Sequence, residues 1–133
     1  MKIFISHASK DAPVARQLAQ ELKAAGHSVW IPENEVLPGD NWAKKVGQAL
    51  EDSDLIVVLV TRHAFESQAV TRDIQYALTA EHIKGRLIPV FIGSETKTPS
   101  QMPWILEKLS PLRVKGKKRN WQEVIEKVDA LAG

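Results

Sequence analysis

An uninterrupted run of six apolar residues, Leu55–Val60, constrains the fold of this chain more than any other feature. A strand covered on both faces is continuously apolar, whereas a half-exposed strand alternates apolar and polar residues. The run is also far shorter than the roughly 20 apolar residues that a membrane-spanning helix needs. It therefore predicts the central strand of a parallel sheet, with helices packed on both faces.

Shorter apolar runs alternate with amphipathic stretches along the rest of the chain, which is typical of an α/β fold with a parallel sheet. The pattern predicts a flavodoxin-like three-layer fold whose five-stranded parallel sheet has the order 2-1-3-4-5. The chain has 133 residues, a length that suits one domain, residues 1–133, since domains typically have about 100–150 residues. The predicted strands are Lys2–Ser6, Ser28–Pro32, Asp54–Thr61, Arg86–Ile92 and Leu112–Lys115.

Four helices are predicted between and after these strands, each with a capping residue and an apolar stripe. Gly26 is expected to end the first helix in a left-handed conformation. The predicted caps are Ser9, Asp40, Ser67 and the pair Asn120 and Glu123. The predicted stripes are Val14, Leu18, Leu22 and Ala25; Trp42, Val46 and Leu50; Val70, Ile74, Ala77 and Leu78; and Val124, Val128 and Leu131.

Composition excludes several classes of function. The chain has no cysteine, which excludes disulfides, thiolate metal sites and cysteine nucleophiles. Its 18 basic and 16 acidic residues leave a net charge of +2, too small to indicate nucleic acid or a membrane surface. No signal-peptide pattern opens the chain, so a cytoplasmic location is expected. The four histidines lack metal-ligand spacing, and no metal site is predicted.

In a sheet of this order, sites lie beyond the carboxyl ends of the strands, near the first and third strands. A response-regulator receiver needs acidic residues there to hold magnesium, but the chain has Ser6-His7-Ala8-Ser9 and Val60-Thr61-Arg62. A flavodoxin or dinucleotide site needs glycines after the first strand, and the first glycine is Gly26. No Gly-x-Ser-x-Gly sequence is present, which excludes a nucleophile elbow.

The strand ends carry five motifs that together resemble those of a TIR (Toll/interleukin-1 receptor) domain of the compact bacterial type. An apolar strand leads into Ser6 and a downstream Asp11, and a second strand follows Gly26. The motifs occur in the family's order and span nearly the whole chain. They are Ile3–Asp11, Gly26–Trp30, Leu37–Trp42, Ser53–Val60 and Ser67–Ile74, with Leu87–Val90 matching the fourth strand.

The resemblance implies one of two functions. Some TIR domains are interaction modules, while others hydrolyse or cyclise NAD by cleaving the bond between nicotinamide and ribose. NAD is then the substrate, and no cofactor is implied. The family's catalytic Glu falls on Asp73, with Glu66 as the alternative carboxylate, and the family's Trp in the same motif is replaced by Ala69. The shortened acid leaves both functions open.

The resemblance also implies which residues contact substrate and partners. Ser6, His7, Lys10, Trp30 and Glu35 are the candidates for substrate binding, although packing for Trp30 and solvation for Lys10 are the plainer interpretations. The loop Leu37, Pro38, Gly39 and Asp40 is the candidate for assembly with other TIR domains, within the longer stretch Glu33–Asp40.

A basic cluster, Arg113–Arg119, holds five cations in seven residues. It can suit an acidic partner or nucleic acid. Without interleaved aromatic residues, a solvated loop is the favoured interpretation, and nucleic-acid binding is not predicted.

Overall fold

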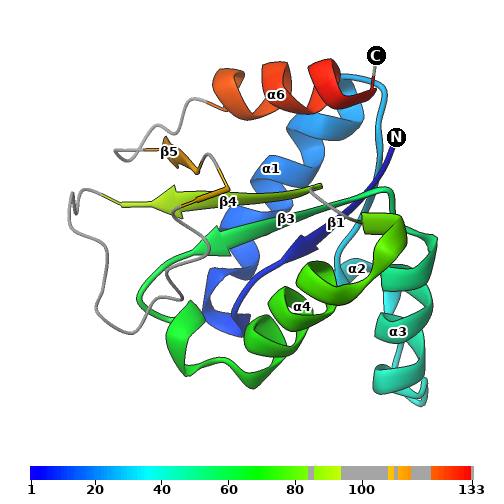
Figure 1. Ribbon diagram of the computed structural model, residues 1–133. Coiled ribbons are helices and arrows are strands. Elements are labelled where there is room, and N and C mark those ends of the chain that lie inside the picture. The colour runs from blue at the N-terminus through cyan, green and yellow to red at the C-terminus, as the bar shows by residue number, and fades with distance from the viewer. Residues whose placement is uncertain (84–85, 94–107, 110, 115–120, 133) are drawn as a thin grey trace.

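The computed structural model describes residues 1–83, 86–93, 108–109, 111–114 and 121–132. Five parallel strands form one sheet in the order β2-β1-β3-β4-β5, which confirms the predicted fold (Figure 1). The strands are β1 (Lys2–Ser6), β2 (Ser28–Trp30), β3 (Leu55–Val60), β4 (Leu87–Ile92) and β5 (Leu112–Val114).

Helices cover both faces of this sheet (Figure 1). The apolar residues of α1 and α6 share one core with one face, and those of α3 and α4 share a second core with the other. The helices are α1 (Ala12–Ala24), α2 (Pro32–Glu35), α3 (Trp42–Asp52), α4 (Gln68–Thr79) and α6 (Gln122–Ala132), with 3-10 turns η1 (Ser9–Asp11), η2 (Ala64–Glu66) and η3 (Glu81–Ile83). None of the described helices is long and apolar enough to cross a membrane.

Strand β3 is the centre of the sheet, as its uninterrupted apolar sequence predicts. All of its residues are buried, and it pairs with β1 on one side and β4 on the other. Leu55, Val57 and Leu59 belong to the α1 and α6 core, and the alternate residues belong to the α3 and α4 core. Because both faces of β3 are covered, a polar side chain in this strand would be buried away from water and would destabilise the fold.

Two of the predicted helix ends are confirmed, and two are wrong. Ser67 caps α4 by accepting a hydrogen bond from the backbone N–H of Val70, and Gly26 follows α1 with a φ of +97°. The cap of α3 is Asn41 rather than Asp40, because the Asp40 carboxylate accepts a hydrogen bond from the N–H of Leu37. Ser9 caps no helix and instead begins η1. Asn120 lies outside the described residues.

Four apolar side chains predicted to be buried are exposed. Trp42 begins α3, Ala25 follows α1, and Leu78 and Leu131 are the next-to-last residues of α4 and α6. Since all four lie at helix ends, the apolar stripe of each helix continues past the part that packs against the sheet. Periodicity alone carries no information about where that packing stops.

The second strand is shorter than predicted. It ends at Trp30, Ile31 is extended and buried, and Pro32 begins α2. Proline suits the first position of a helix because its missing N–H would have no partner there. Strands β3 and β4 begin one residue later than predicted, and Lys115, the predicted end of the fifth strand, lies outside the described residues together with 116–119 of the basic cluster.

Candidate functional site

Strand β1 and helix α4 bring two buried polar side chains together at the carboxyl end of the sheet. The Ser6 hydroxyl donates a hydrogen bond to Oδ2 of Asp73 at 2.8 Å, although the two residues are 67 positions apart in the sequence. Ser6 is 1% exposed and Asp73 is 4% exposed. Val70 and Ile74 pack α4 against the sheet, which fixes Asp73 over the end of β1.

The carboxyl group of Asp73 has an unusual electrostatic environment. Burial raises its pKa from 3.8 to about 6, against the opposing effects of the Ser6 hydrogen bond and the charges of Arg72 and His7. The group is therefore mostly ionised at pH 7. Its second oxygen, Oδ1, is buried and has no hydrogen-bond partner among the described residues. A buried carboxylate with one unused oxygen is a candidate binding or catalytic group, because native structures rarely leave such atoms unsatisfied.

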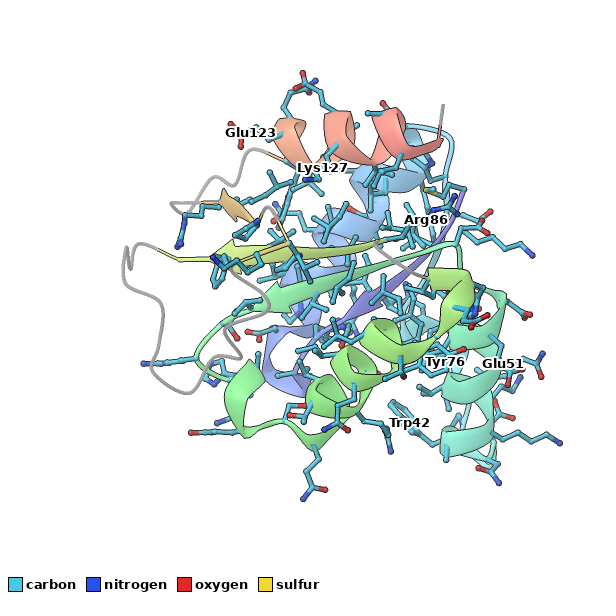
Figure 2. The ribbon with its side chains drawn as sticks, in the orientation of Figure 1. Trp42, Glu51, Tyr76, Arg86, Glu123 and Lys127 are labelled. Atoms are coloured by element: carbon cyan, nitrogen blue, oxygen red, sulfur yellow. The ribbon has the colours of Figure 1, made fainter. Side chains whose placement is uncertain are left out.

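Asp73 lines a small cleft of about 50 Å³, which we call the Asp73 cleft. Ser6 and His7 lie on its β1 side, and Ala69 and Arg72 lie on its α4 side. Trp42 of α3 also lines the cleft and is 48% exposed. In Figure 2 its ring lies between α4 and the start of α3. The exposed aromatic ring of this cleft therefore comes from α3, since Phe4 in its lining is almost completely buried and position 69 on α4 has only a methyl group.

The structure brings together three of the predicted site residues, namely Ser6, His7 and Asp73. His7 is buried, and its Nδ1 lies 3.4 Å from the carbonyl oxygen of Ile5. The described lining of the Asp73 cleft does not include Lys10, Glu35 or Trp30. Lys10 and Glu35 are exposed, and the ring of Trp30 stacks on that of Phe4 with centroids 5.2 Å apart.

The alternative carboxylate, Glu66, is exposed in η2, before α4 begins. It lines a separate shallow depression on the surface with Gln68 and Gln75. Arg72 borders both this depression and the Asp73 cleft. Ser67 also borders both hollows, so they adjoin, but Glu66 is not among the described residues that line the Asp73 cleft.

Residues Leu37–Asp40 form a tight turn between α2 and α3. The N–H of Asp40 donates to the carbonyl oxygen of Leu37 at 3.0 Å, and Gly39 has a φ of +91°. Proline followed by a glycine with positive φ is the pattern of a type II turn. The turn presents Leu37, whose side chain is 65% exposed, to solvent.

A second polar contact lies beyond the carboxyl ends of β1 and β3. The Thr61 hydroxyl donates to Oδ2 of Asp11 at 2.5 Å, and the Thr61 oxygen accepts from the N–H groups of His63 and Ala64. This contact ties the segment after β1 to the segment after β3. The sequence predicts Asp11 only as part of the opening motif, and nothing in its sequence neighbourhood indicates Thr61 as its partner.

No cluster of three His, Cys, Asp or Glu side chains that could hold a metal ion occurs in the described part of the chain. The polar and aromatic groups in the described lining of the Asp73 cleft include the Asp73 carboxylate, the Arg72 guanidinium, the His7 imidazole, the Trp42 indole and the hydroxyls of Ser6, Ser9 and Ser67.

Two curated proteins are similar to this chain over most of its length. It is 29% identical over 111 residues to the NAD(+) hydrolase PdTIR of Paracoccus denitrificans, a match that covers 81% of this chain and 37% of that protein. It is 32% identical over 91 residues to the probable 2' cyclic ADP-D-ribose synthase TcpB of Brucella abortus, covering 66% of this chain and 36% of that protein. The chain thus spans little more than a third of either relative.

A solved structure and a family model agree with this similarity. The TIR domain of the Toll-related receptor TRR-2 from Hydra magnipapillata superposes with a TM-score of 0.70 at 19% identity, covering 98% of this chain and 95% of that one. The family model described as TIR domain matches residues 3–128. The chain therefore belongs to the TIR domain family.

Proposed function

We propose that this chain cleaves NAD between nicotinamide and ribose, with Asp73 as the catalytic carboxylate. The observation that carries the proposal is the state of Asp73, which is buried at the carboxyl end of β1 with Oδ2 held by Ser6 and Oδ1 unpartnered among the described residues. The names of the two curated relatives, an NAD hydrolase and a probable cyclic ADP-ribose synthase, support the same chemistry.

The two oxygens of Asp73 suit two tasks. Oδ1 can accept a hydrogen bond from a ribose hydroxyl, while the bond from Ser6 keeps the carboxylate from rotating. When the bond to nicotinamide breaks, positive charge develops on the ribose, and a nearby carboxylate in a desolvated site stabilises it. Nicotinamide leaves with the bonding electron pair. In hydrolysis, water then adds to the anomeric carbon and releases a proton.

The shorter side chain at position 73 is expected to slow this reaction without abolishing it. Aspartate places the charge about 1 Å further from a substrate than glutamate would, and a misplacement on that scale can cost about 10²-fold in rate. Ser6 and His7 lie beside the carboxylate, and Trp42 offers an exposed ring for a substrate base. No role in this reaction is assigned to Lys10, Trp30 or Glu35, which are not among the described residues that line the cleft.

Assembly with other TIR domains is part of the proposal. The Asp73 cleft has a volume of about 50 Å³, far below the roughly 300–1,000 Å³ of typical ligand pockets. We propose that contacts between TIR domains, made through Leu37–Asp40, help to complete the site around NAD. The exposed leucine that begins this turn suits such a contact.

The test follows nicotinamide release from NAD with concentrated or artificially clustered protein. We expect Asp73→Ala to abolish release and Asp73→Glu to preserve or increase it. Glu66→Ala is the matched control and should behave as wild type, because Glu66 lies outside the Asp73 cleft. Equal rates for Asp73→Ala and wild type would contradict the assignment of Asp73.

A catalytically weak or inactive interaction module is the second candidate, favoured by the shortened acid and the small cleft. In that case clustered wild-type protein would release no nicotinamide, and release would appear only in Asp73→Glu. TIR–TIR contact would then be the function that remains.

Assembly has a separate test that requires no activity. Leu37→Ser should weaken self-association, or binding to another TIR domain, in sedimentation or cross-linking measurements. Leu78→Ser removes another exposed leucine, from α4, and serves as the control. A wild-type protein that remains monomeric at high concentration and binds no TIR domain would contradict the proposal.

A further inference from the structure

A second and larger hollow lies along the free edge of the sheet. It has a volume of about 360 Å³ and lies between the edge strand β2 and helix α3, so we call it the β2 groove. No described residue lines both the β2 groove and the Asp73 cleft. Its volume is within the range of small-molecule sites.

The groove exists because α3 does not cover the edge strand. Val46 and Leu50 anchor α3 over the inner strands, while Lys45, Gln48 and Asp52 lie along the side of the helix that borders β2. Lys45, Gln48 and Asp52 are three and four positions apart, a spacing that places them on one side of a helix. Ala49 is small, which leaves the space between helix and strand open.

An aromatic surface lies in this groove. Trp30 stacks on Phe4 with ring centroids 5.2 Å apart and an interplanar angle of 15°. Phe4 is almost completely buried, so it covers one face of the Trp30 ring from the inside. Trp30 remains partly exposed and lines the groove, where a further planar ring can extend the stack.

Two cationic side chains also line the groove. Lys45 has only a loose ion pair with Asp40, at 3.9 Å and with its side chain half exposed, so the ammonium group remains available to an anion. Lys2 lies on the β1 side of the groove. The Gln48 amide can donate a hydrogen bond to a ring nitrogen, and the Asp52 carboxylate can accept one from an exocyclic amino group. An aromatic surface with two cations complements a planar ring that bears an anionic group.

From these contacts we propose that the β2 groove binds a nucleoside monophosphate, with its base stacked on Trp30 and its phosphate beside Lys45. This site is distinct from the one proposed for NAD cleavage, and it does not depend on that activity. The occupant is a small molecule, because β2 has only three residues and offers too short an edge for an added strand.

Adenosine 5'-monophosphate is the probe, and binding is measured by calorimetry and by NMR of the indole N–H groups. We expect binding with a Kd below about 1 mM and a shift of the Trp30 indole signal. Adenosine lacks the phosphate, and ribose 5-phosphate lacks the ring. Each should bind at least tenfold more weakly. If ribose 5-phosphate binds as tightly as adenosine 5'-monophosphate, the groove recognises only an anion, and the proposal is wrong.

Variants separate the groove from the Asp73 cleft. Lys45→Glu should weaken binding at least tenfold, while Lys44→Glu, an exposed neighbour outside the groove, should leave it unchanged. Gln48→Trp should block the groove from an exposed position. Asp73→Ala should bind the nucleotide as wild type does. Binding that survives Lys45→Glu and Gln48→Trp, or that is lost in Asp73→Ala, would overturn the proposal.

Discussion

The Asp73 cleft and the β2 groove are built on the same sheet but differ in what they require of the fold. The cleft is small and holds a buried carboxyl group whose pKa is raised to about 6. The groove is several times larger and its charged residues, Lys2, Lys45 and Asp52, are exposed. The ionised Asp73 carboxylate has lost its hydrating water, and its hydrogen bonds within the protein do not fully replace it. The charged groups of the β2 groove are exposed and stay hydrated.

This difference supports the separate roles proposed for the two hollows, catalysis for the Asp73 cleft and ligand binding for the β2 groove. A buried and poorly compensated carboxylate lowers the stability of the folded state, and such groups gather at sites that act on substrates. The exposed side chains of the groove, such as Gln48, have no comparable cost, so they can be exchanged with little effect on folding. Changes in the free energy of unfolding therefore distinguish the two regions, and the predictions below run from the largest change to the smallest.

Val58→Asp should abolish folding, which would remove both hollows at once. Val58 is fully buried in β3, between Ser6 of β1 and Pro89 of β4, and an unpaired charge there would cost more than about 4 kcal/mol. Val58→Ala is the control and should fold with a loss of about 2 kcal/mol. The measurement is solubility and cooperative thermal melting, and a Val58→Asp protein that melts cooperatively would contradict the placement of β3.

Asp73→Asn should stabilise the protein at pH 7. The pKa of Asp73 in the folded state, about 6, lies above its unfolded value near 3.8, so the wild type loses stability as the pH rises between these values. The loss amounts to about 3 kcal/mol at pH 7, and the asparagine variant avoids it. Urea unfolding of both proteins from pH 4 to pH 7 measures the effect. If the difference in unfolding free energy between wild type and Asp73→Asn is the same at every pH, the pKa of Asp73 is not raised by folding, and the prediction is wrong.

Ser6→Ala should destabilise the protein at pH 7 by about 1–2 kcal/mol, because a hydrogen bond to a charged group is lost. The same bond lowers the pKa of Asp73, so its removal should raise that pKa further and move the acidic limb of any pH–rate profile to higher pH. Ser6→Thr keeps the hydroxyl and is the matched comparison. An unchanged pH dependence of unfolding in Ser6→Ala would contradict the contact with Asp73.

Gln48→Ala should change the free energy of unfolding by less than about 0.5 kcal/mol, since Gln48 is an exposed residue of α3 and alanine favours helices. The thermal midpoint should stay within a few degrees of wild type. A loss above about 1 kcal/mol would show that the β2 groove is part of the packed structure rather than an open surface, and would remove the contrast with the Asp73 cleft.

Sequence patterns predicted the sheet well because each strand has its own local signal. The apolar run of β3 and the motif at the end of β1 needed no knowledge of distant residues, and the observed strand order confirms the prediction. Errors appear at the ends of elements, where packing decides the outcome. Trp42 and Leu131 continue their apolar stripes correctly but extend past the sheet, so they are exposed.

The site was predictable in part. Ser6, His7 and Asp73 carry family motifs, and the structure places all three in one cleft. The contact between Asp11 and Thr61 and the aromatic wall formed by Trp42 depend on how β1, α3 and the segment after β3 meet in space. The β2 groove exists because α3 leaves the edge strand β2 partly uncovered. The pattern of apolar residues in the sequence does not indicate which strand a helix leaves uncovered.

The hydrogen bond between Ser6 and Asp73 has a consequence for the order in which the chain folds. It joins residues 67 positions apart, and it needs β1 already paired with β3 and α4 already seated. Closing such long loops is entropically slow, and domains built on distant pairings fold more slowly than helical bundles do. The Asp73 carboxylate is therefore expected to gain its partner late in folding and to lose it early when α4 detaches, so local unfolding of α4 would separate the two residues while the inner strands remain paired.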